Sequence, residues 1–118
     1  MRFLMISYPP EGVVPGPPSD EDMAKAGGLV EEMMKTGKLV DTGTIQVPSS
    51  GTKVRYSGGK FTATDGPFTE AKELIAGFAI VEVAAKDEAL AMARRFYEVM
   101  GDGEGEVLHI VGQEEMNS

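Results

Sequence analysis

Residues 65–73 read Asp-Gly-Pro-Phe-Thr-Glu-Ala-Lys-Glu and form the densest local signal in this chain. An aspartate such as Asp65 can accept hydrogen bonds from backbone N–H groups two or three residues further on, which closes a turn. Pro67 fixes its own φ and suits the first turn of a helix, so residues 69–73 are expected to form one helical turn. We interpret the stretch as a rigid connector that follows a strand. Alternatively, the same corner presents Asp65 as an acid, a base or a ligand anchor.

The stretch separates two halves with the same pattern of strand, helix and strand. Strands are expected at residues 2–8, 39–47, 53–57, 60–64, 77–83 and 107–111, and helices at residues 20–36 and 87–100. Gly58-Gly59 is a two-residue signal for a β-hairpin. This order predicts an α+β fold of the ferredoxin-like type, β-α-β-β-α-β, with an inserted β-hairpin and both helices on one face of the sheet. A shift of apolar parity in residues 39–47 predicts a β-bulge at Gly43.

Both expected helices have an apolar stripe and a polar face. Ser19 followed by Asp22 resembles a capping box, which predicts that the first helix begins directly after Ser19. Gly27-Gly28 interrupts this helix, which indicates close packing of helix on sheet or, alternatively, room for a ligand beneath the helix. The stripes are Met23, Ala26, Leu29, Val30 and Met33 in the first helix, and Ala89, Leu90, Ala93, Phe96, Tyr97 and Met100 in the second.

Two of the expected strands, residues 2–8 and 77–83, are apolar on both faces. Two helices on one side of the sheet would leave the second apolar face open to water. An exposed apolar face of that size is a liability for a soluble chain. We therefore expect a homodimer in which the open sheet faces meet, since symmetric dimers are the commonest oligomers.

Composition narrows the classes of function. The 118 residues fit one domain, placed at residues 1–112, with a flexible tail at residues 113–118. The net charge of −8 argues against a nucleic-acid partner and favours a basic protein partner. The chain has no cysteine and one histidine, so we expect no metal site and no cofactor. Pro9-Pro10 ends the apolar start too early for a signal peptide or membrane span, which indicates a cytoplasmic protein with no membrane partner.

The string Asp-Gly-Pro-Phe-x-Glu-x-Lys-Glu resembles the signature of the YCII-related proteins of the DGPF type, and the resemblance extends from Arg2 to about Gly112. It includes the opening strand, the first helix, the Gly58-Gly59 hairpin and strand 77–83. The resemblance implies a ferredoxin-like chain that forms a dimeric α+β barrel. The DGPF type has no settled reaction. Its members are often encoded beside extracytoplasmic-function sigma factors.

Some wider YCII relatives are cofactor-independent enzymes, including a dehydrochlorinase. They tend to use a histidine in the first helix together with an aspartate. Here the first helix, residues 20–36, contains no histidine. This departure separates the chain from the catalytic pattern of those relatives.

Two side chains are candidates for catalysis. Asp65 would be held by turn chemistry, and His109 is the only side chain of a type that titrates near neutral pH. The two would form an orienting pair if the fold brings them together, whereas His109 is otherwise a structural residue of the last strand. The candidate ligand-binding residues are Tyr8, Arg55, Phe68 and Glu70.

Two classes of function follow from these residues. The first is a non-catalytic ligand-binding or regulatory dimer, whose partner is a small organic ligand or a regulatory protein, with the link to a sigma factor implied by the resemblance. The alternative is a cofactor-independent lyase or isomerase that acts on a small organic substrate through Asp65 or His109. An enzyme needs a concave site where titratable groups converge, so the surroundings of Asp65 discriminate between the two.

Overall fold

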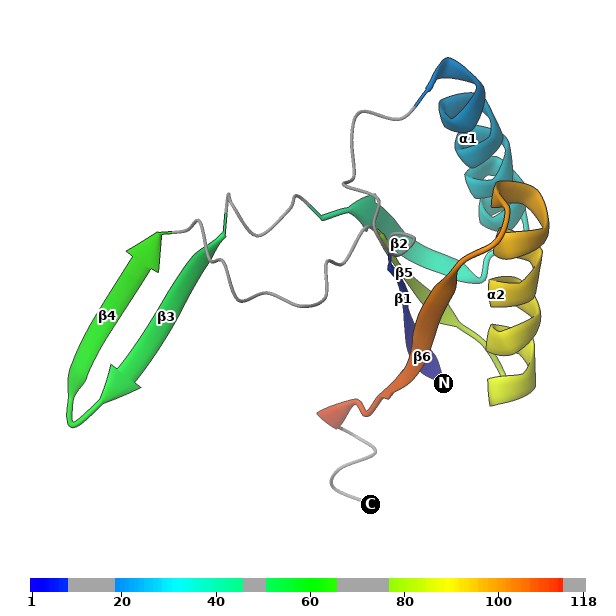
Figure 1. Cartoon of the computed structure of the whole chain (residues 1–118). Coiled ribbons are helices and arrows are strands. Elements are labelled where there is room, and N and C mark those ends of the chain that lie inside the picture. The colour runs from blue at the N-terminus through cyan, green and yellow to red at the C-terminus, as the bar shows by residue number, and fades with distance from the viewer. Residues whose placement is uncertain (9–18, 46–50, 66–76, 114–118) are drawn as a thin grey trace.

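The computed structural model describes residues 1–8, 19–45, 51–65 and 77–113 (Figure 1). The elements are β1 (Arg2–Tyr8), α1 (Asp20–Lys35), β2 (Leu39–Thr44), β3 (Thr52–Ser57), β4 (Lys60–Asp65), β5 (Gly77–Glu82), α2 (Lys86–Met100) and β6 (Glu104–Ile110). An antiparallel sheet has the strand order β2-β5-β1-β6, and β3 and β4 form a separate antiparallel hairpin. The α+β class is confirmed. The helical turn expected at residues 69–73 lies outside the described residues.

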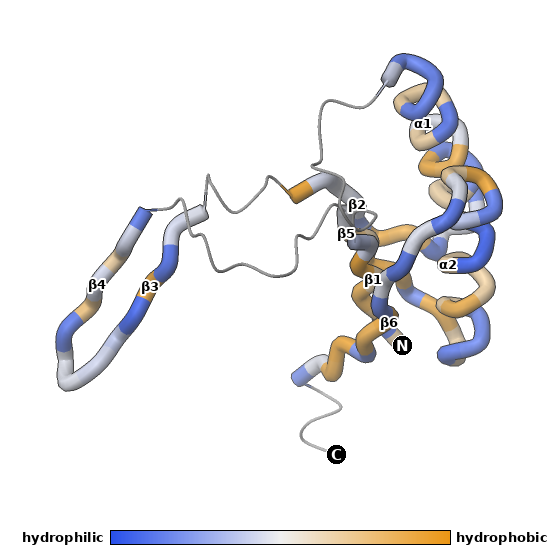
Figure 2. Tube along the Cα trace, viewed as in Figure 1, coloured by the Kyte–Doolittle hydropathy of each residue, from blue (hydrophilic) through white to orange (hydrophobic). Residues whose placement is uncertain are grey.

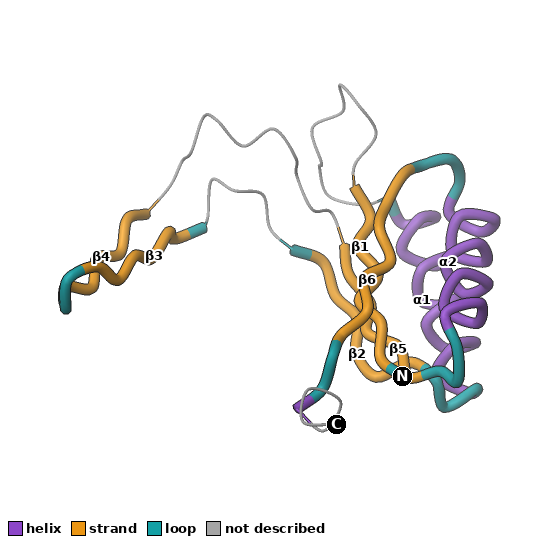
Figure 3. Tube along the Cα trace, turned by 90° about the horizontal axis from the view of Figure 1, so that it is seen from below, coloured by secondary structure: helices purple, strands orange, loops and turns teal. Residues whose placement is uncertain are grey.

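The core lies between the two helices and one face of the four-stranded sheet. Figure 3 shows α1 and α2 on the same side of this sheet, with the hairpin β3–β4 on the other side and at a distance from it. In Figure 2 the hydrophobic colour is concentrated on the sheet strands and on parts of both helices, whereas the hairpin is mostly hydrophilic. The buried residues are Phe3, Leu29, Met33, Leu39, Val81, Val83 and Ala89.

Local chemistry accounts for the ends of α1 and for the hairpin turn. The Ser19 hydroxyl accepts the backbone N–H of Asp22 at 3.1 Å, so the predicted cap of α1 is confirmed. The helix is followed by Gly37 at φ 73°, a left-handed conformation that suits glycine. Gly58 and Gly59 have φ of 58° and 79°, which is the pair of positive values that a tight hairpin turn of type I′ requires.

Two predictions about strands are wrong in detail. The register between β2 and β5 shifts between Leu39 and Asp41, so the irregularity lies at Val40 and not at Gly43. Gly43 instead accommodates the ring of Phe78, whose Cε1 would lie 2.9 Å from a Cβ at that position. The last strand starts at residue 104, three residues before the expected start, because pairing with β1 continues through Glu104, Gly105 and Glu106.

The predicted stripes of the helices are partly wrong. Met23 and Leu90 are 57% and 44% exposed, whereas Met92 and Val99 pack against the core. A helical period gives the spacing of apolar residues but leaves the direction of the stripe to the packing. The packing explanation for Gly27-Gly28 is wrong as well, because a Cβ at either residue would meet no atom within 4 Å.

The cap of α1 yields a prediction about stability. Replacing Ser19 by Ala removes the acceptor for the Asp22 N–H, so the free energy of unfolding should fall by about 0.5–2 kcal/mol. The free energy of unfolding of Ser19→Asp should stay close to that of the unchanged protein, because aspartate caps a helix equally well. Urea denaturation followed by far-ultraviolet circular dichroism measures both. Equal stability of the two variants would contradict a capping role.

Candidate functional site

The face of the four-stranded sheet turned away from the helices is apolar. Leu4 pairs with Ile80 on one side and with Leu108 on the other, and Ile6 pairs with Phe78. Their neighbours along each strand pack in the core, and successive residues of a strand point to opposite faces. We call this surface the open sheet face. Its apolar residues are Leu4, Ile6, Phe78, Ile80, Leu108 and Ile110.

Two polar pairs border the open sheet face at opposite ends of β1. At one end the Tyr8 hydroxyl donates to Glu106 Oε2 at 2.5 Å. At the other end Arg2 Nε donates to Glu82 Oε2 at 2.8 Å, and the N-terminal amine lies 3.4 Å from Glu82 Oε1. The hydrogen bond from Arg2 holds the pKa of the Glu82 carboxyl below its ordinary value, and the N-terminal charge acts in the same direction.

The arrangement has the character of a binding surface. An apolar floor with a few convergent polar groups is what sites for small organic ligands offer, and the apolar floor also suits another protein surface. Both carboxylates of the polar pairs are exposed, so each keeps contact with water while it accepts its bond. Within the described residues, no group of three or more histidine, aspartate or glutamate side chains could hold a metal ion.

The predicted site residues are distributed over several surfaces. Tyr8 lies at the border of the open sheet face. His109 is on the opposite face, because it pairs with the core residue Phe3. The two rings stack with centroids 5.1 Å apart and planes tilted by 31°, and His109 is exposed. His109 therefore does not share a surface with Tyr8.

Asp65 and Arg55 lie in the hairpin. Asp65 Oδ1 accepts the hydroxyl of Thr52, its cross-strand partner, at 2.7 Å. The backbone N–H bonds expected for this carboxylate would come from residues outside the described ranges, and Phe68 and Glu70 lie there too. Asp65 lies in the β3–β4 hairpin, whereas His109 lies in β6 of the four-stranded sheet, so the orienting pair stays a prediction.

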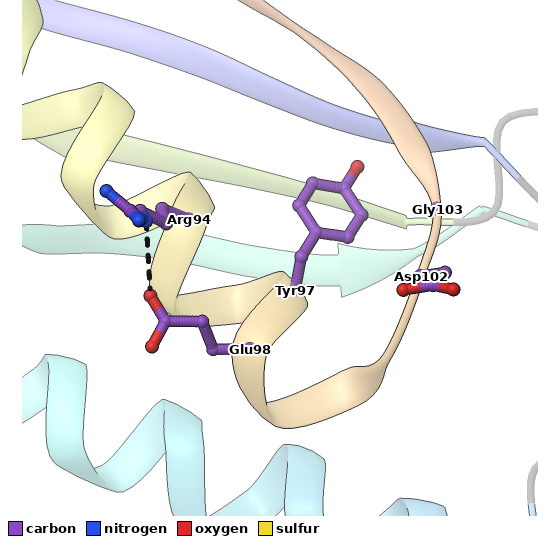
Figure 4. A pocket seen from close by; sticks show the side chains of 5 residues that line it. All are labelled: Arg94, Tyr97, Glu98, Asp102 and Gly103. Atoms are coloured by element: carbon purple, nitrogen blue, oxygen red, sulfur yellow. Dashed lines mark ion pairs between the residues drawn. The ribbon is translucent and has the colours of Figure 1, made fainter.

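Two surface hollows accompany the helices in the described part of the chain. The first, at the end of α2, is lined by Arg94, Tyr97, Glu98, Asp102 and Gly103 (Figure 4). Arg94 and Glu98 form an ion pair of 3.5 Å there, and both are largely exposed. Burial raises the pKa of the Tyr97 hydroxyl, and nearby Glu104 adds to this. The hollow is open and its charges are solvated, so it lacks the convergence that a catalytic site needs.

The second hollow lies between the helices. Arg95 donates two hydrogen bonds of 3.0 Å to Glu32 across it, and Lys38 lies 3.5 Å from Glu88. The hydrogen bond from Arg95 lowers the pKa of Glu32. The Arg95–Glu32 pair links α1 to α2, and the Lys38–Glu88 pair links the segment between α1 and β2 to α2, so both are explained as contacts that hold packed elements together.

Sequence reasoning missed two members of the polar border. Glu106 lies just before the strand expected at residues 107–111, although Glu104, Glu106, Leu108 and Ile110 follow the two-residue period of a strand. Arg2 was not predicted as a site residue, because its partner Glu82 is 80 residues away in the sequence. No local pattern could have found that pair.

Comparisons with known proteins identify relatives. A family model described as the YCII-related domain matches residues 1–111. An uncharacterised protein of Rhizobium meliloti (strain 1021) is 30% identical over 97 residues, which is 80% of this chain and 78% of that protein. In the described part of the chain, neither helix has the length and apolar character needed to cross a membrane.

The Arg2–Glu82 pair yields a prediction about pH. A glutamate whose pKa is lowered by folding contributes stability above its unfolded pKa, and the contribution is lost as the pH falls through the folded value. The titration midpoint of Glu82, measured by NMR of its side-chain carboxyl, should lie below that of glutamate in the unfolded chain. Arg2→Gln should raise it, whereas Arg94→Gln should leave it unchanged. A midpoint of Glu82 unaffected by Arg2→Gln would refute the assigned cause.

Proposed function

The chain belongs to the YCII-related domain family, and on this premise we propose that it is a homodimeric binding module of the DGPF type. In the proposed dimer, two ferredoxin-like chains turn their open sheet faces toward each other and form a dimeric α+β barrel. The observation that carries the proposal is the open sheet face itself, which has six apolar side chains on the side without helices. The strand order β2-β5-β1-β6 supports the ferredoxin-like assignment.

The proposed ligand is a small organic molecule held between the two sheets. Leu4, Ile6 and Phe78 would contact its apolar part, and the Tyr8–Glu106 pair would contact a polar group. Arg55, Phe68 and Glu70 remain predicted contributors to the same site. A regulatory protein in the cytoplasm, of the extracytoplasmic-function sigma factor class, is the proposed macromolecular partner, and the net charge of −8 favours a basic docking surface on it.

Binding is favoured over catalysis by the positions of the two candidate acid-base groups. Asp65 is bonded to Thr52 in the hairpin, and His109 stacks on Phe3 in the other sheet. A lyase or isomerase would need groups that converge on one substrate. We therefore propose a binding module, in which Asp65 serves the hairpin.

A charge placed on the open sheet face should prevent dimer formation. Sedimentation equilibrium of the unchanged chain should give twice its 12.6 kDa. Ile6→Glu should shift the species to monomer, because an unpaired carboxylate would be buried at the interface. Met23→Glu is the matched control, since it makes the same change at a residue exposed on α1, and it should remain dimeric. A monomeric unchanged chain would contradict the proposal.

The ligand is tested separately by native mass spectrometry. The dimer, incubated with a small-molecule extract of cells, should retain an organic adduct, and Tyr8→Phe should lower its occupancy without changing the dimer. The hydroxyl that donates to Glu106 would be lost in this variant, while the ring would remain. If the dimer showed no added mass under any condition, a small-molecule ligand would be contradicted. The regulatory protein would then remain as the proposed partner.

A further inference from the structure

The first half of β6 alternates between glycine on one face and carboxylates on the other. Gly105 lies on the same face as Val107, and Val107 and its partner Met5 pack against the core, so this face is turned to the helices. Glu104 and Glu106 are the alternate residues and lie on the side of the open sheet face. A strand covered by helices on one side usually carries apolar side chains there. Glycine on the inner face of β6 therefore needs an explanation.

The ring of Tyr97 occupies the space that a side chain would fill on this inner face. A Cβ added to Gly105 would lie 2.5 Å from the Tyr97 hydroxyl oxygen and would also collide with the carbonyl oxygen of Ile6. A Cβ added to Gly103 would lie 2.9 Å from Tyr97 Cε1. Figure 4 shows the ring reaching from α2 toward the chain near Gly103. The two glycines thus form a seat for the ring, and neither accepts a larger side chain unless the strand or the ring moves.

Tyr97 is itself held by α2 and by the core. Its ring meets the ring of Phe96 edge to face, with centroids 5.1 Å apart and planes at 81°, and Phe96 packs against the core. The backbone N–H of Gly101 donates to the Tyr97 carbonyl at 2.8 Å where the helix ends. Burial raises the pKa of the Tyr97 hydroxyl, and the charge of Glu104 adds to this, so the side chain stays neutral. Tyr97 is therefore a fixed and uncharged support for the strand that crosses it.

The supported segment is a part of β6 that has few other supports. β6 is an edge strand, and within the described residues it pairs only with β1. The pairing begins at Glu104, opposite Tyr8, so the segment is also the end of the strand. The ends of elements fray readily, and glycine loses more conformational freedom on folding than any other residue. The hydrogen bond from Tyr8 to Glu106 lies within this segment, so it depends on where the segment is held.

We propose that Tyr97 is a positioning residue of the ligand site. Its ring, seated on Gly103 and Gly105, holds the first half of β6 against β1. This places the Glu106 carboxylate beside the Tyr8 hydroxyl and beside the polar group of the ligand. The inference rests on the small-molecule site proposed above and adds a residue on the opposite face of the sheet. Tyr97 acts through the strand, so it does not contact the ligand itself.

Carbon-13 NMR of the Glu106 side-chain carboxyl at neutral pH tests the positioning in the intact protein. Tyr8→Phe gives the resonance of this carboxylate without its hydrogen bond. Tyr97→Ala should move the resonance to the same value, whereas Tyr97→Phe, which keeps the ring, should leave it unchanged. Val99→Ala is the matched control, because it removes apolar volume from the core side of the same helix, and it should also leave the resonance unchanged.

Two further variants keep the test decisive if Tyr97→Ala does not fold, which urea denaturation shows. Tyr97→Leu fills the core but is too short to reach Gly105, so it should move the Glu106 resonance as well. Gly105→Ala leaves α2 unchanged and forces the strand and the ring apart, with the same expected result. The positioning role would be overturned if the folded variants kept the resonance of the unchanged protein, or if Val99→Ala moved it equally far.

Native mass spectrometry separates this role from the ligand itself. With the small-molecule extract of cells, Tyr97→Ala should retain about tenfold less organic adduct than the unchanged protein, because one hydrogen bond to a charged group has about this effect on binding. Tyr97→Phe should retain as much adduct as the unchanged protein. If the unchanged protein retained none, the proposed ligand would be overturned, while the NMR experiment would still decide whether Tyr97 positions Glu106. If Tyr97→Ala lost the Tyr8–Glu106 bond and kept the adduct, the positioning role in binding would be overturned and the ligand would stand.

Discussion

Two helices cover only one face of a four-stranded sheet, and the rest of this structure depends on that limit. The helices bury Phe3 and Val81 against one face. The alternate residues of the same strands, including Leu4 and Ile80, then lie on the opposite face, which neither α1 nor α2 covers. An apolar face of this kind is stable when another surface covers it. The proposed dimer follows from this exposed face, because a second copy has the same apolar face and each of the two faces can cover the other.

Alternation along strands also organises the charge of the molecule. Around the open sheet face, polar groups occur as the bonded pairs Arg2–Glu82 and Tyr8–Glu106, which keep their carboxylates in contact with water. The hairpin follows the same rule on a smaller scale, with Tyr56 on its apolar face and basic residues on the other.

Features that depend on neighbours in sequence were predictable. The Ser19 cap and the Gly58-Gly59 turn follow from hydrogen bonds and φ angles within a few residues, and both were predicted correctly. The α+β class also followed from the periods of the strands and helices. The direction of the apolar stripe on each helix could not be predicted, because a period of 3.6 residues does not say which side of the helix meets the sheet. Met92 thus packs in the core where Leu90 was expected.

The candidate site shows the same division more sharply. The sequence by itself determined the residue types available for chemistry, a single histidine and no cysteine, and marked Asp65 and Tyr8 as candidates. Only the tertiary structure decided which groups meet: Tyr8 with Glu106, Asp65 with Thr52, and His109 with Phe3. The physical reason is that strand register joins residues up to about a hundred positions apart, and a shift of one residue would turn every side chain to the other face. Local propensity carries no information about that register, whereas the packing of the core against the helices selects it.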